Sequence, residues 1–292
     1  MEKLITSEMF RGRFLKNLPS SFVWKNSPLQ MYPLSSMSDY FILPTPLLKT
    51  DYNFLIYVEE GVFIQQIGID IIEVKAPAIV CISVGTIASL EKINSKLKGY
   101  FILIEEEAML SLLTKESSLN LFSIFPVLEI DNYNNKWIYN LCTLLHDELN
   151  REIYDNEISN SLLKALLHKI LILSDKQIIM NRTQQIAIQF KKLVYYHFKE
   201  EKNTLFYAQK LSISENYLNR CVKQVFNKNA KELILNITIL NSQILLWDLT
   251  KSISEISFEI NFDDASYFSR LFKKVTGKSP SEFRKNIMHD LS

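Results

Sequence analysis

The sequence predicts an α+β chain of more than one domain, with a β-rich N-terminal part and an all-α C-terminal part. Up to about residue 135, short segments rich in Val, Ile, Phe and Tyr alternate with turn residues; beyond it, apolar residues recur at helical spacing. The length of 292 residues fits two domains, and an apolar fraction of 47% is ample for buried cores.

The N-terminal segments have the spacing of antiparallel strands. Glu-Glu-Gly, Ile-Gly-Ile-Asp, Ala-Pro and Lys-Gly separate them, as tight turns would. Short strands at regular intervals predict a small antiparallel barrel or sandwich. The expected strands are Phe54–Val58, Val62–Ile67, Ile69–Val74, Ala78–Ser83 and Tyr100–Ile104.

Aromatic side chains in and before these strands have two interpretations. They either line a cavity for a small-molecule effector or fill the core. A cavity of this composition would take an apolar or uncharged molecule, because no His and few charges are expected inside. The aromatic residues are Tyr40, Phe41, Tyr52, Phe54, Tyr57 and Phe63.

Residues 136–182 predict a helical connector that ends in a short linker at 176–183. Two apolar stripes run through it, and they either pack on the β domain or form a dimer seam. One stripe contains Trp137, Ile138, Leu141, Leu144, Leu145 and Leu149, and the other contains Ile158, Leu162, Leu166, Ile170 and Leu173.

The segment Ser252–Arg284 predicts two short helices joined by a tight turn. Ser252 followed three residues later by Glu255 is a capping box that starts the first helix. In the turn, Asn261 tolerates a left-handed backbone and an Asp can cap the second helix, which should begin near Ala265.

The same pattern occurs fifty residues upstream, in SENYLNRCVKQVFNKNAKEL, after a short helix at Leu205–Leu211. Both copies have the same apolar stripe and the same outer polar positions, which a solvated helix face does not explain. Each copy is therefore interpreted as a helix-turn-helix whose second helix enters a DNA major groove. The matched outer pairs are Asn216 with Ser266, Asn219 with Ser269, Arg220 with Arg270 and Lys223 with Lys273, and Tyr217 matches Tyr267 in the same register.

These outer side chains suit double-stranded DNA. Arg binds guanine through two hydrogen bonds, short polar side chains reach base edges, and Lys neutralises phosphate. A long helix, Ala230–Trp247, should separate the two motifs by about 25 Å. A final helix should start at Ser279-Pro280 and support the second motif through Phe283.

The region from about Gln184 to Arg284 resembles the DNA-binding domain of the AraC/XylS family of bacterial transcription regulators. The segments that carry the resemblance are YAQKLSISENYLNRCVKQVF and ISEISFEINFDDASYFSRLFKKVTGKSPSEFR. The chain departs from the family pattern at Asn261, where Gly is usual, at Ser257, where Ala is usual, and near Thr238, where an Arg is usual.

The resemblance implies base contacts from one set of side chains, and the positive charge of lysine predicts phosphate contacts from another. The base-reading set is Asn216, Asn219, Arg220, Ser266, Ser269 and Arg270, and the phosphate-binding set is Lys223, Lys273 and Lys274. The N-terminal strands are similar to the cupin-like sensor domain of many family members. We therefore expect a cupin-like effector-binding or dimerisation domain at 1–135 and a DNA-binding domain at 183–292.

The expected partners are double-stranded DNA, RNA polymerase, a small-molecule effector and a second copy of the chain. The charge distribution agrees, because residues 183–292 carry 16 Lys and Arg against 11 Asp and Glu, whereas residues 1–182 carry 17 against 21. We expect a regulator, and specifically an activator. An effector-independent regulator, controlled by a protein partner or by dimerisation alone, is the alternative.

A cupin-type enzyme fused to a DNA-binding domain is the least favoured alternative. All four histidines lie outside the expected strands, so no metal, no cofactor and no catalysis are expected. Cys142 and His146 share one helix face, but two ligands do not make a metal site. Three unpaired cysteines, an N-terminus without an apolar core and the absence of a long uncharged apolar run predict a cytoplasmic protein that does not contact membranes.

Overall fold

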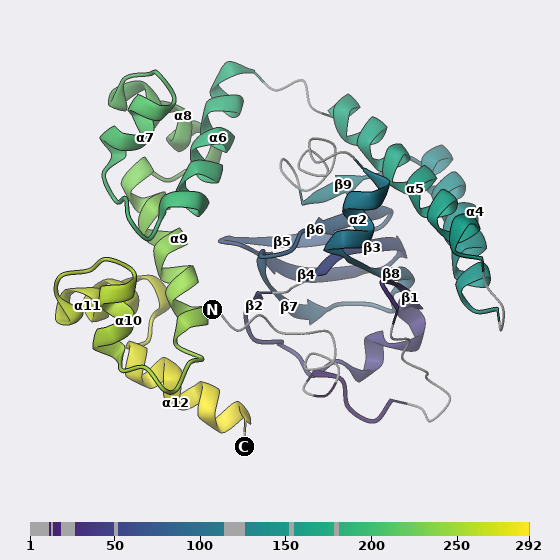
Figure 1. Ribbon diagram of the computed structural model, residues 1–292, viewed down its shortest axis with the longest axis horizontal. Coiled ribbons are helices and arrows are strands. Elements are labelled where there is room, and N and C mark those ends of the chain that lie inside the picture. The colour runs from purple at the N-terminus through teal and green to yellow at the C-terminus, as the bar shows by residue number, and fades with distance from the viewer. Residues whose placement is uncertain are drawn as a thin grey trace. The chain divides into compact units, whose positions relative to one another are not determined.

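The computed structural model describes residues 12, 14–18, 27–49, 52–113, 126–151, 155–177 and 181–291. It divides into two compact units, one containing Lys3–Ile179 and the other Met180–Ser292. The predicted fold class is confirmed: antiparallel sheets form the first unit and helices form the second. Figure 1 shows the elements of both units.

The first unit contains two antiparallel sheets. The five-stranded sheet has the order β1-β8-β3-β6-β9, and the four-stranded sheet has the order β2-β7-β4-β5. Two short 3-10 turns, Leu34–Ser36 and Ser38–Tyr40, follow β1. The strands are β1 (Leu29–Pro33), β2 (Leu48–Lys49), β3 (Tyr52–Glu60), β4 (Val62–Ile67), β5 (Asp70–Lys75), β6 (Ala78–Ile82), β7 (Ile87–Ile93), β8 (Lys98–Glu105) and β9 (Val127–Glu129).

Strand β3 shows how the five-stranded sheet separates two cores. Successive side chains of a strand point to opposite faces, so both faces of a central strand can be buried. Leu55 and Tyr57 pack with the helices, whereas Phe54, Ile56 and Val58 pack with side chains of the four-stranded sheet. The first unit is therefore a sandwich with helices over one outer face.

Helices α2 (Glu106–Leu112), α4 (Asn132–Leu149) and α5 (Asn156–Gln177) provide that cover. The predicted apolar stripes of α4 and α5 are only partly right. Leu144 and Ile158 are 58% and 48% exposed, whereas Cys142 and Leu163 are fully buried in the helix–sheet core. No described helix has the length and apolar character needed to cross a bilayer.

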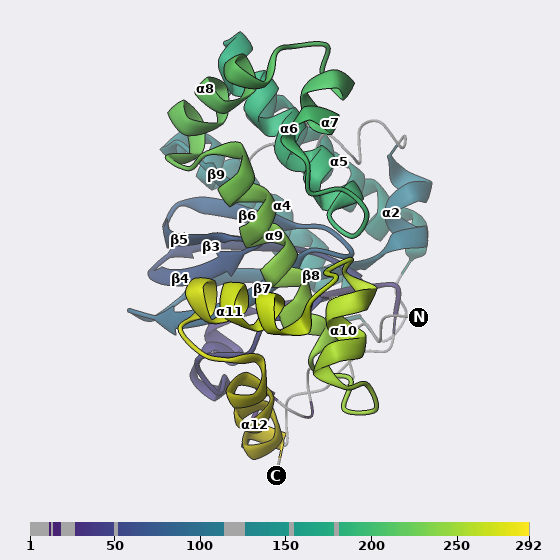
Figure 2. The same ribbon diagram turned by 90° about the vertical axis from the view of Figure 1, so that its left-hand side faces the viewer.

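The second unit is all helical, and Figure 2 shows α9 leading from the α7–α8 pair to the α10–α11 pair. Of the predicted linker at 176–183, residues 178–180 lie outside the described residues, and the others belong to the end of α5 and the start of α6. Helix α6 starts behind Asn181, whose side chain forms a capping box with Gln184. The helices are α6 (Arg182–His197), α7 (Thr204–Lys210), α8 (Glu215–Phe226), α9 (Ala230–Leu245), α10 (Ile253–Glu259), α11 (Ala265–Thr276) and α12 (Pro280–Leu291).

Candidate functional site

The two helix pairs turn in the same way. Ile213 N–H donates to Ala208 O at 3.0 Å, and Phe262 N–H donates to Ser257 O at 2.9 Å. Ala208 and Ser257 are fully buried, as close crossing of two helices requires. These matched 6→1 bonds are those of a Schellman motif, so the two pairs turn from helix to helix in the same way, as two copies of one helix-turn-helix motif would.

A left-handed residue follows the first helix of each pair. It is Ser212 in the first motif, with φ 54°, and Asn261 in the second, with φ 59°. Asn tolerates this conformation because its short polar side chain bonds locally. The prediction that Asn261 replaces Gly without loss of the turn is confirmed.

The second helices, α8 and α11, also begin and end alike. The side chain of Ser214 caps α8 by accepting from Tyr217 N–H at 3.3 Å, and that of Asp264 caps α11 by accepting from Ser266 N–H at 2.7 Å. Left-handed Asn227 and Gly277 end them. Both helices have 12 residues, so the two motifs present helices of equal length.

The inner faces of α8 and α11 hold the helices in place. Leu218 and Val222 in α8, and Phe268 and Phe272 in α11, are fully buried at matched positions. The Phe272 ring also contacts the Phe283 ring of α12, with centroids 5.6 Å apart, as the sequence predicted. The outer faces are consequently fixed in orientation within each motif.

The structure divides the predicted base-reading side chains into two groups. Most are exposed, but Asn219 and Ser269 are partly buried and bond within the protein. Asn219 Oδ1 accepts from Ala230 N–H at 3.0 Å, and Ser269 Oγ donates to Ala265 O at 2.8 Å. The exposed predicted side chains are Asn216, Arg220, Lys223, Ser266, Arg270, Lys273 and Lys274.

Each exposed arginine stacks on a tyrosine of its own helix. The Arg220 guanidinium carbon lies 4.9 Å from the ring centroid of Tyr217, and that of Arg270 lies 5.8 Å from that of Tyr267. An arginine over an aromatic face is stabilised electrostatically and restricted in its rotamers. No function for these tyrosines is predicted from the sequence, although a Tyr three residues before the Arg in both copies is a usable signal.

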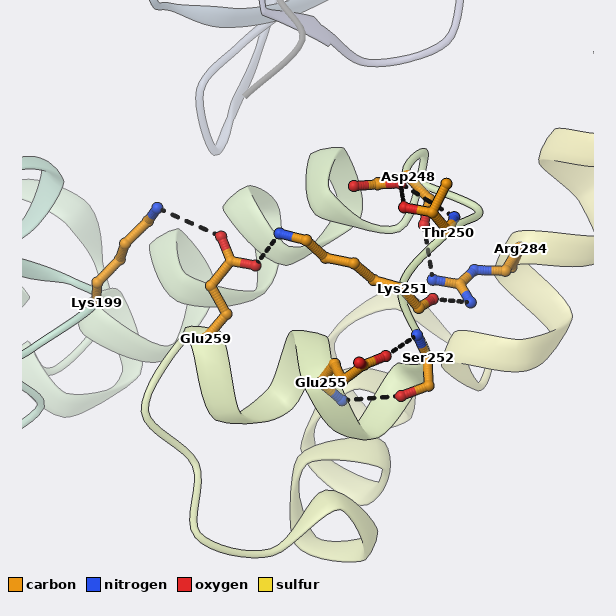
Figure 3. A network of polar contacts seen from close by, with 8 residues as sticks. All are labelled: Lys199, Asp248, Thr250, Lys251, Ser252, Glu255, Glu259 and Arg284. Atoms are coloured by element: carbon orange, nitrogen blue, oxygen red, sulfur yellow. Dashed lines mark hydrogen bonds and ion pairs between the residues drawn. The ribbon is translucent and has the colours of Figure 1, made fainter. Parts of the chain in front are cut away.

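The loop between α9 and α10 is held by Arg284, a residue for which the sequence alone predicts no role. Its Nη1 donates to Lys251 O at 2.8 Å, and its Nη2 lies 3.4 Å from Asp248 O (Figure 3). Its Nε lies 3.3 Å from Leu246 O. A guanidinium suits this role because its donors point in fixed directions. The clamp fixes the start of the second motif.

The predicted capping boxes at the starts of α10 and α12 are present. Glu255 accepts from Ser252 N–H at 2.6 Å, and Glu282 accepts from Ser279 N–H at 2.7 Å. In both cases the backbone hydrogen bond, followed by one from the serine side chain, lowers the pKa of the carboxyl group. Figure 3 shows the first of these boxes.

The first unit contains a cavity of about 70 Å³ between its two sheets. Phe41, Tyr52, Phe54 and Phe63 line it, as the cavity interpretation of these aromatics requires. Tyr57 instead faces the helices, where its hydroxyl donates to Asn135 Oδ1 at 2.7 Å. The polar side chains of the lining are Ser38, Thr45, Gln65 and Ser89, and the lining residues carry no charge.

No group of three or more His, Cys, Asp and Glu side chains within the described ranges could hold a metal ion. Cys142 is buried, which raises the pKa of its thiol, and His146 lies against Tyr100 with ring centroids 5.4 Å apart. The absence of metal, cofactor and catalysis stays a prediction.

Residues 207–286 match a family model described as a helix-turn-helix domain. The Msm operon regulatory protein of Streptococcus mutans is 36% identical over 108 residues, covering 37% of this chain and 39% of that protein. The transcriptional activator RhaS of Escherichia coli is 22% identical over 170 residues, covering 55% and 61%. The chain thus spans less than two thirds of the length of either relative.

Among solved structures, that of ToxT from Vibrio cholerae is similar, with 18% sequence identity and a TM-score of 0.43. The match covers 88% of this chain and 97% of the ToxT chain. The fold and the duplicated motifs define a tandem helix-turn-helix protein. Its C-terminal domain is an AraC/XylS-type helix-turn-helix domain, and its relatives are AraC-family transcription regulators.

Proposed function

We propose that this chain is a sequence-specific DNA-binding transcription regulator, and specifically an activator. The observation that carries the proposal is the duplicated outer face of α8 and α11, where Arg220 and Arg270 stand exposed over tyrosine rings at matched positions. The name of one relative, a transcriptional activator, favours activation. Because its target DNA would lie in the bacterial cytoplasm, we place its action there and assign it no enzymatic activity.

In this mechanism α8 and α11 enter successive major grooves of one DNA face. The 16-residue helix α9 is about 24 Å long, and the motifs at its ends extend beyond it toward the roughly 34 Å repeat of B-DNA. Lys223, Lys273 and Lys274 bind phosphates together with the helix N-termini. Base edges are read by the exposed side chains of Asn216, Arg220, Ser266 and Arg270. Asn219 and Ser269 contribute less to base recognition, because their side-chain oxygens already form hydrogen bonds within the protein.

The test is binding of the full chain to DNA upstream of its own and neighbouring genes at two salt concentrations. Arg270→Ala should cost about 1–3 kcal/mol on the specific site and little on random DNA. Lys273→Ala is the matched control, because loss of a phosphate contact should weaken both DNAs alike and reduce the salt slope by about 1. An equal loss on both DNAs for Arg270→Ala would overturn the base-reading assignment.

The cavity of the first unit is the proposed effector site. Its aromatic and aliphatic walls and its uncharged polar groups suit a small apolar or uncharged molecule. Thermal unfolding of the full chain with a panel of such molecules tests the proposal, since a ligand that binds the native state raises Tm. Ala88→Leu, which narrows the cavity, should abolish the shift; the same shift in wild type and variant would place the ligand elsewhere.

The outer side of α4 and α5 is the proposed dimer seam. Leu144, Ile158 and Ile172 are each about half exposed there, which favours an interface with a second copy. Sedimentation of the wild-type chain and of Leu144→Glu tests it, because a buried Glu would dissociate the dimer. A dimer that survives the substitution would exclude this seam. RNA polymerase is the remaining proposed partner, consistent with activation.

A further inference from the structure

Two connections join the helix-turn-helix motifs of the second unit, and α9 is only one of them. The other runs from the loop between α6 and α7 to the turn between α10 and α11. Lys202 Nζ donates to Ile260 O at 2.6 Å and to Asn261 O at 2.9 Å. In the opposite direction, Asn261 Nδ2 donates to Glu200 O at 3.1 Å. We call these three hydrogen bonds the tether.

The tether holds its ammonium group firmly. Besides the two carbonyl oxygens, Lys202 Nζ lies 4.7 Å from the ring centroid of Phe262, which is itself buried. Partial burial lowers the pKa of Lys202, while the carboxylates of Asp263, Glu200 and Glu201 act in the opposite direction. The two carbonyls directly follow α10, where the helix dipole also favours a cation.

Neighbouring charges support the same connection. Lys199, just after α6, lies 3.9 Å from Glu259 of the second motif, and Lys251 lies 2.5 Å from the other oxygen of that carboxylate (Figure 3). These side chains are about a third exposed, so solvent weakens the pairs. The tether therefore depends mainly on the hydrogen bonds from the Lys202 ammonium to two backbone carbonyls, on its contact with the buried Phe262 ring, and on the hydrogen bond from Asn261 to Glu200 O.

The amide of Asn261 is not required by the turn in which it lies. At φ 59° Gly would serve equally well, and Gly277 occupies the corresponding left-handed position at the end of α11. What Gly could not do is donate to Glu200 O. The turn does not require the Asn261 side chain, and that side chain instead provides a contact between the two motifs.

The tether limits how far α8 and α11 can move relative to each other. Helix α9 and the Arg284 clamp fix where the second motif begins, but on their own they leave the α10–α11 pair able to turn about that point. The tether is a second connection, at the turn between α10 and α11, and it closes a ring that prevents this rotation. We propose that Lys202 and Asn261 are positioning residues that restrict the chain to DNA half-sites at one spacing.

This inference rests on the proposed DNA-binding function, because spacing matters only if both helices read DNA together. Each added base pair rotates a half-site by about 34° and moves it by about 3.4 Å. A rigid pair of motifs cannot follow that displacement without bending the DNA, whereas a hinged pair can.

The experiment measures binding of the full chain to DNAs whose two half-sites are separated by the optimal spacing or by one or two more or fewer base pairs. We expect the wild type to lose about tenfold in affinity per base pair. For Asn261→Gly and Lys202→Met, the affinity should fall only about twofold per base pair added or removed. Both variants should bind the DNA of optimal spacing nearly as well as the wild type does. Asn227→Gly is the matched control, since it makes the same replacement at the left-handed residue that ends α8.

A second measurement needs no DNA. Spin labels at Gln224→Cys and Lys274→Cys, both exposed, report the distance between α8 and α11, and the three native cysteines are buried. The distribution should be narrow in the wild type and in Asn227→Gly and broader in both tether variants. Unchanged distributions, or spacing profiles identical to the wild type, would overturn the tether. Broadened distributions with no DNA binding by any of the proteins would support the tether and overturn the regulator function.

Discussion

The guanidinium carbon of Arg220 lies 4.9 Å from the ring centroid of Tyr217, three residues earlier on α8. Arg270 and Tyr267 repeat the arrangement on α11 at 5.8 Å. Both arginines are exposed, so the stack restricts their rotamers while leaving the donors accessible. An arginine that is already oriented loses less conformational entropy when it binds a guanine.

The first prediction therefore concerns the tyrosines. Tyr217→Leu and Tyr267→Leu should each weaken specific DNA binding about two- to fivefold, the value of an exposed cation–π contact of about 0.5–1 kcal/mol. Binding to random DNA should change little. Tyr→Phe at the same positions keeps the ring face and is the control in a titration monitored by fluorescence anisotropy. A loss in the Phe variants as large as in the Leu variants would assign the effect to the hydroxyl group instead.

The second prediction separates a structural asparagine from a reading one. Asn219→Ala should destabilise the second unit by about 1 kcal/mol, because Ala230 N–H at the start of α9 loses its acceptor. Asn216→Ala, at an exposed position, should stay within about 0.5 kcal/mol of the wild type in stability yet weaken specific DNA binding. Urea unfolding and DNA titration of both variants measure the two effects. Equal stability of the two variants would contradict the assignment.

Asn219 also shows which features of the site cannot be predicted from the sequence alone. Caps and turns are local, so Ser252 with Glu255, Asp264 before α11 and the left-handed Asn261 could all be predicted from neighbouring residues. The bond from Ala230 to Asn219 joins residues eleven apart on two helices, and no periodicity indicates it. The repeat correctly predicts which face of α8 is outer. It does not predict which side chains on that face form hydrogen bonds within the protein.

The same limit applies to longer connections and to the helix–sheet core. Lys202 and Ile260 are 58 residues apart, and their contact depends on how two motifs pack. In α5 the apolar residues are so frequent that periodicity alone could not choose between Ile158, which is exposed, and Leu163, which is buried. Strands β1, β2, β7 and β9 are missed by the sequence prediction. Strands β2 and β9 have only two and three residues, too few to carry a pattern, and β1 (LQMYP) and β7 (IASLEKI) lack the runs of Val, Ile, Phe and Tyr that indicate the other strands.

The third prediction concerns the clamp on the loop between α9 and α10. Arg284→Met should destabilise the second unit by about 1–3 kcal/mol, because three backbone carbonyls lose charge-assisted hydrogen bonds. Arg284→Lys should recover only part of this, since one ammonium cannot reach all three carbonyls in the same geometry. Hydrogen exchange across 246–252 should accelerate in both variants. Arg182→Lys, at the exposed start of α6, is the control and should leave that exchange unchanged.

The last prediction is a pH dependence that originates in the capping boxes. Hydrogen bonds from Ser252 and Ser279 lower the pKa of the Glu255 and Glu282 carboxyl groups in the folded chain. A carboxyl group whose pKa is lower in the folded state stabilises the fold above its unfolded pKa. That contribution is lost as the pH falls through the folded pKa. The second unit should therefore lose stability below the ordinary glutamate range of about 4.3, not around neutral pH.

The double variant Glu255→Gln with Glu282→Gln isolates this contribution from all other carboxylates. Gln keeps an oxygen that accepts from the serine backbone, but it carries no charge and does not titrate in this range. Urea unfolding of both full-length proteins from pH 6 to pH 3 should show the wild type more stable at pH 6, with the difference shrinking as the pH falls. A difference in unfolding free energy that stays constant over this range would mean that the two caps act through hydrogen-bond geometry alone and not through charge.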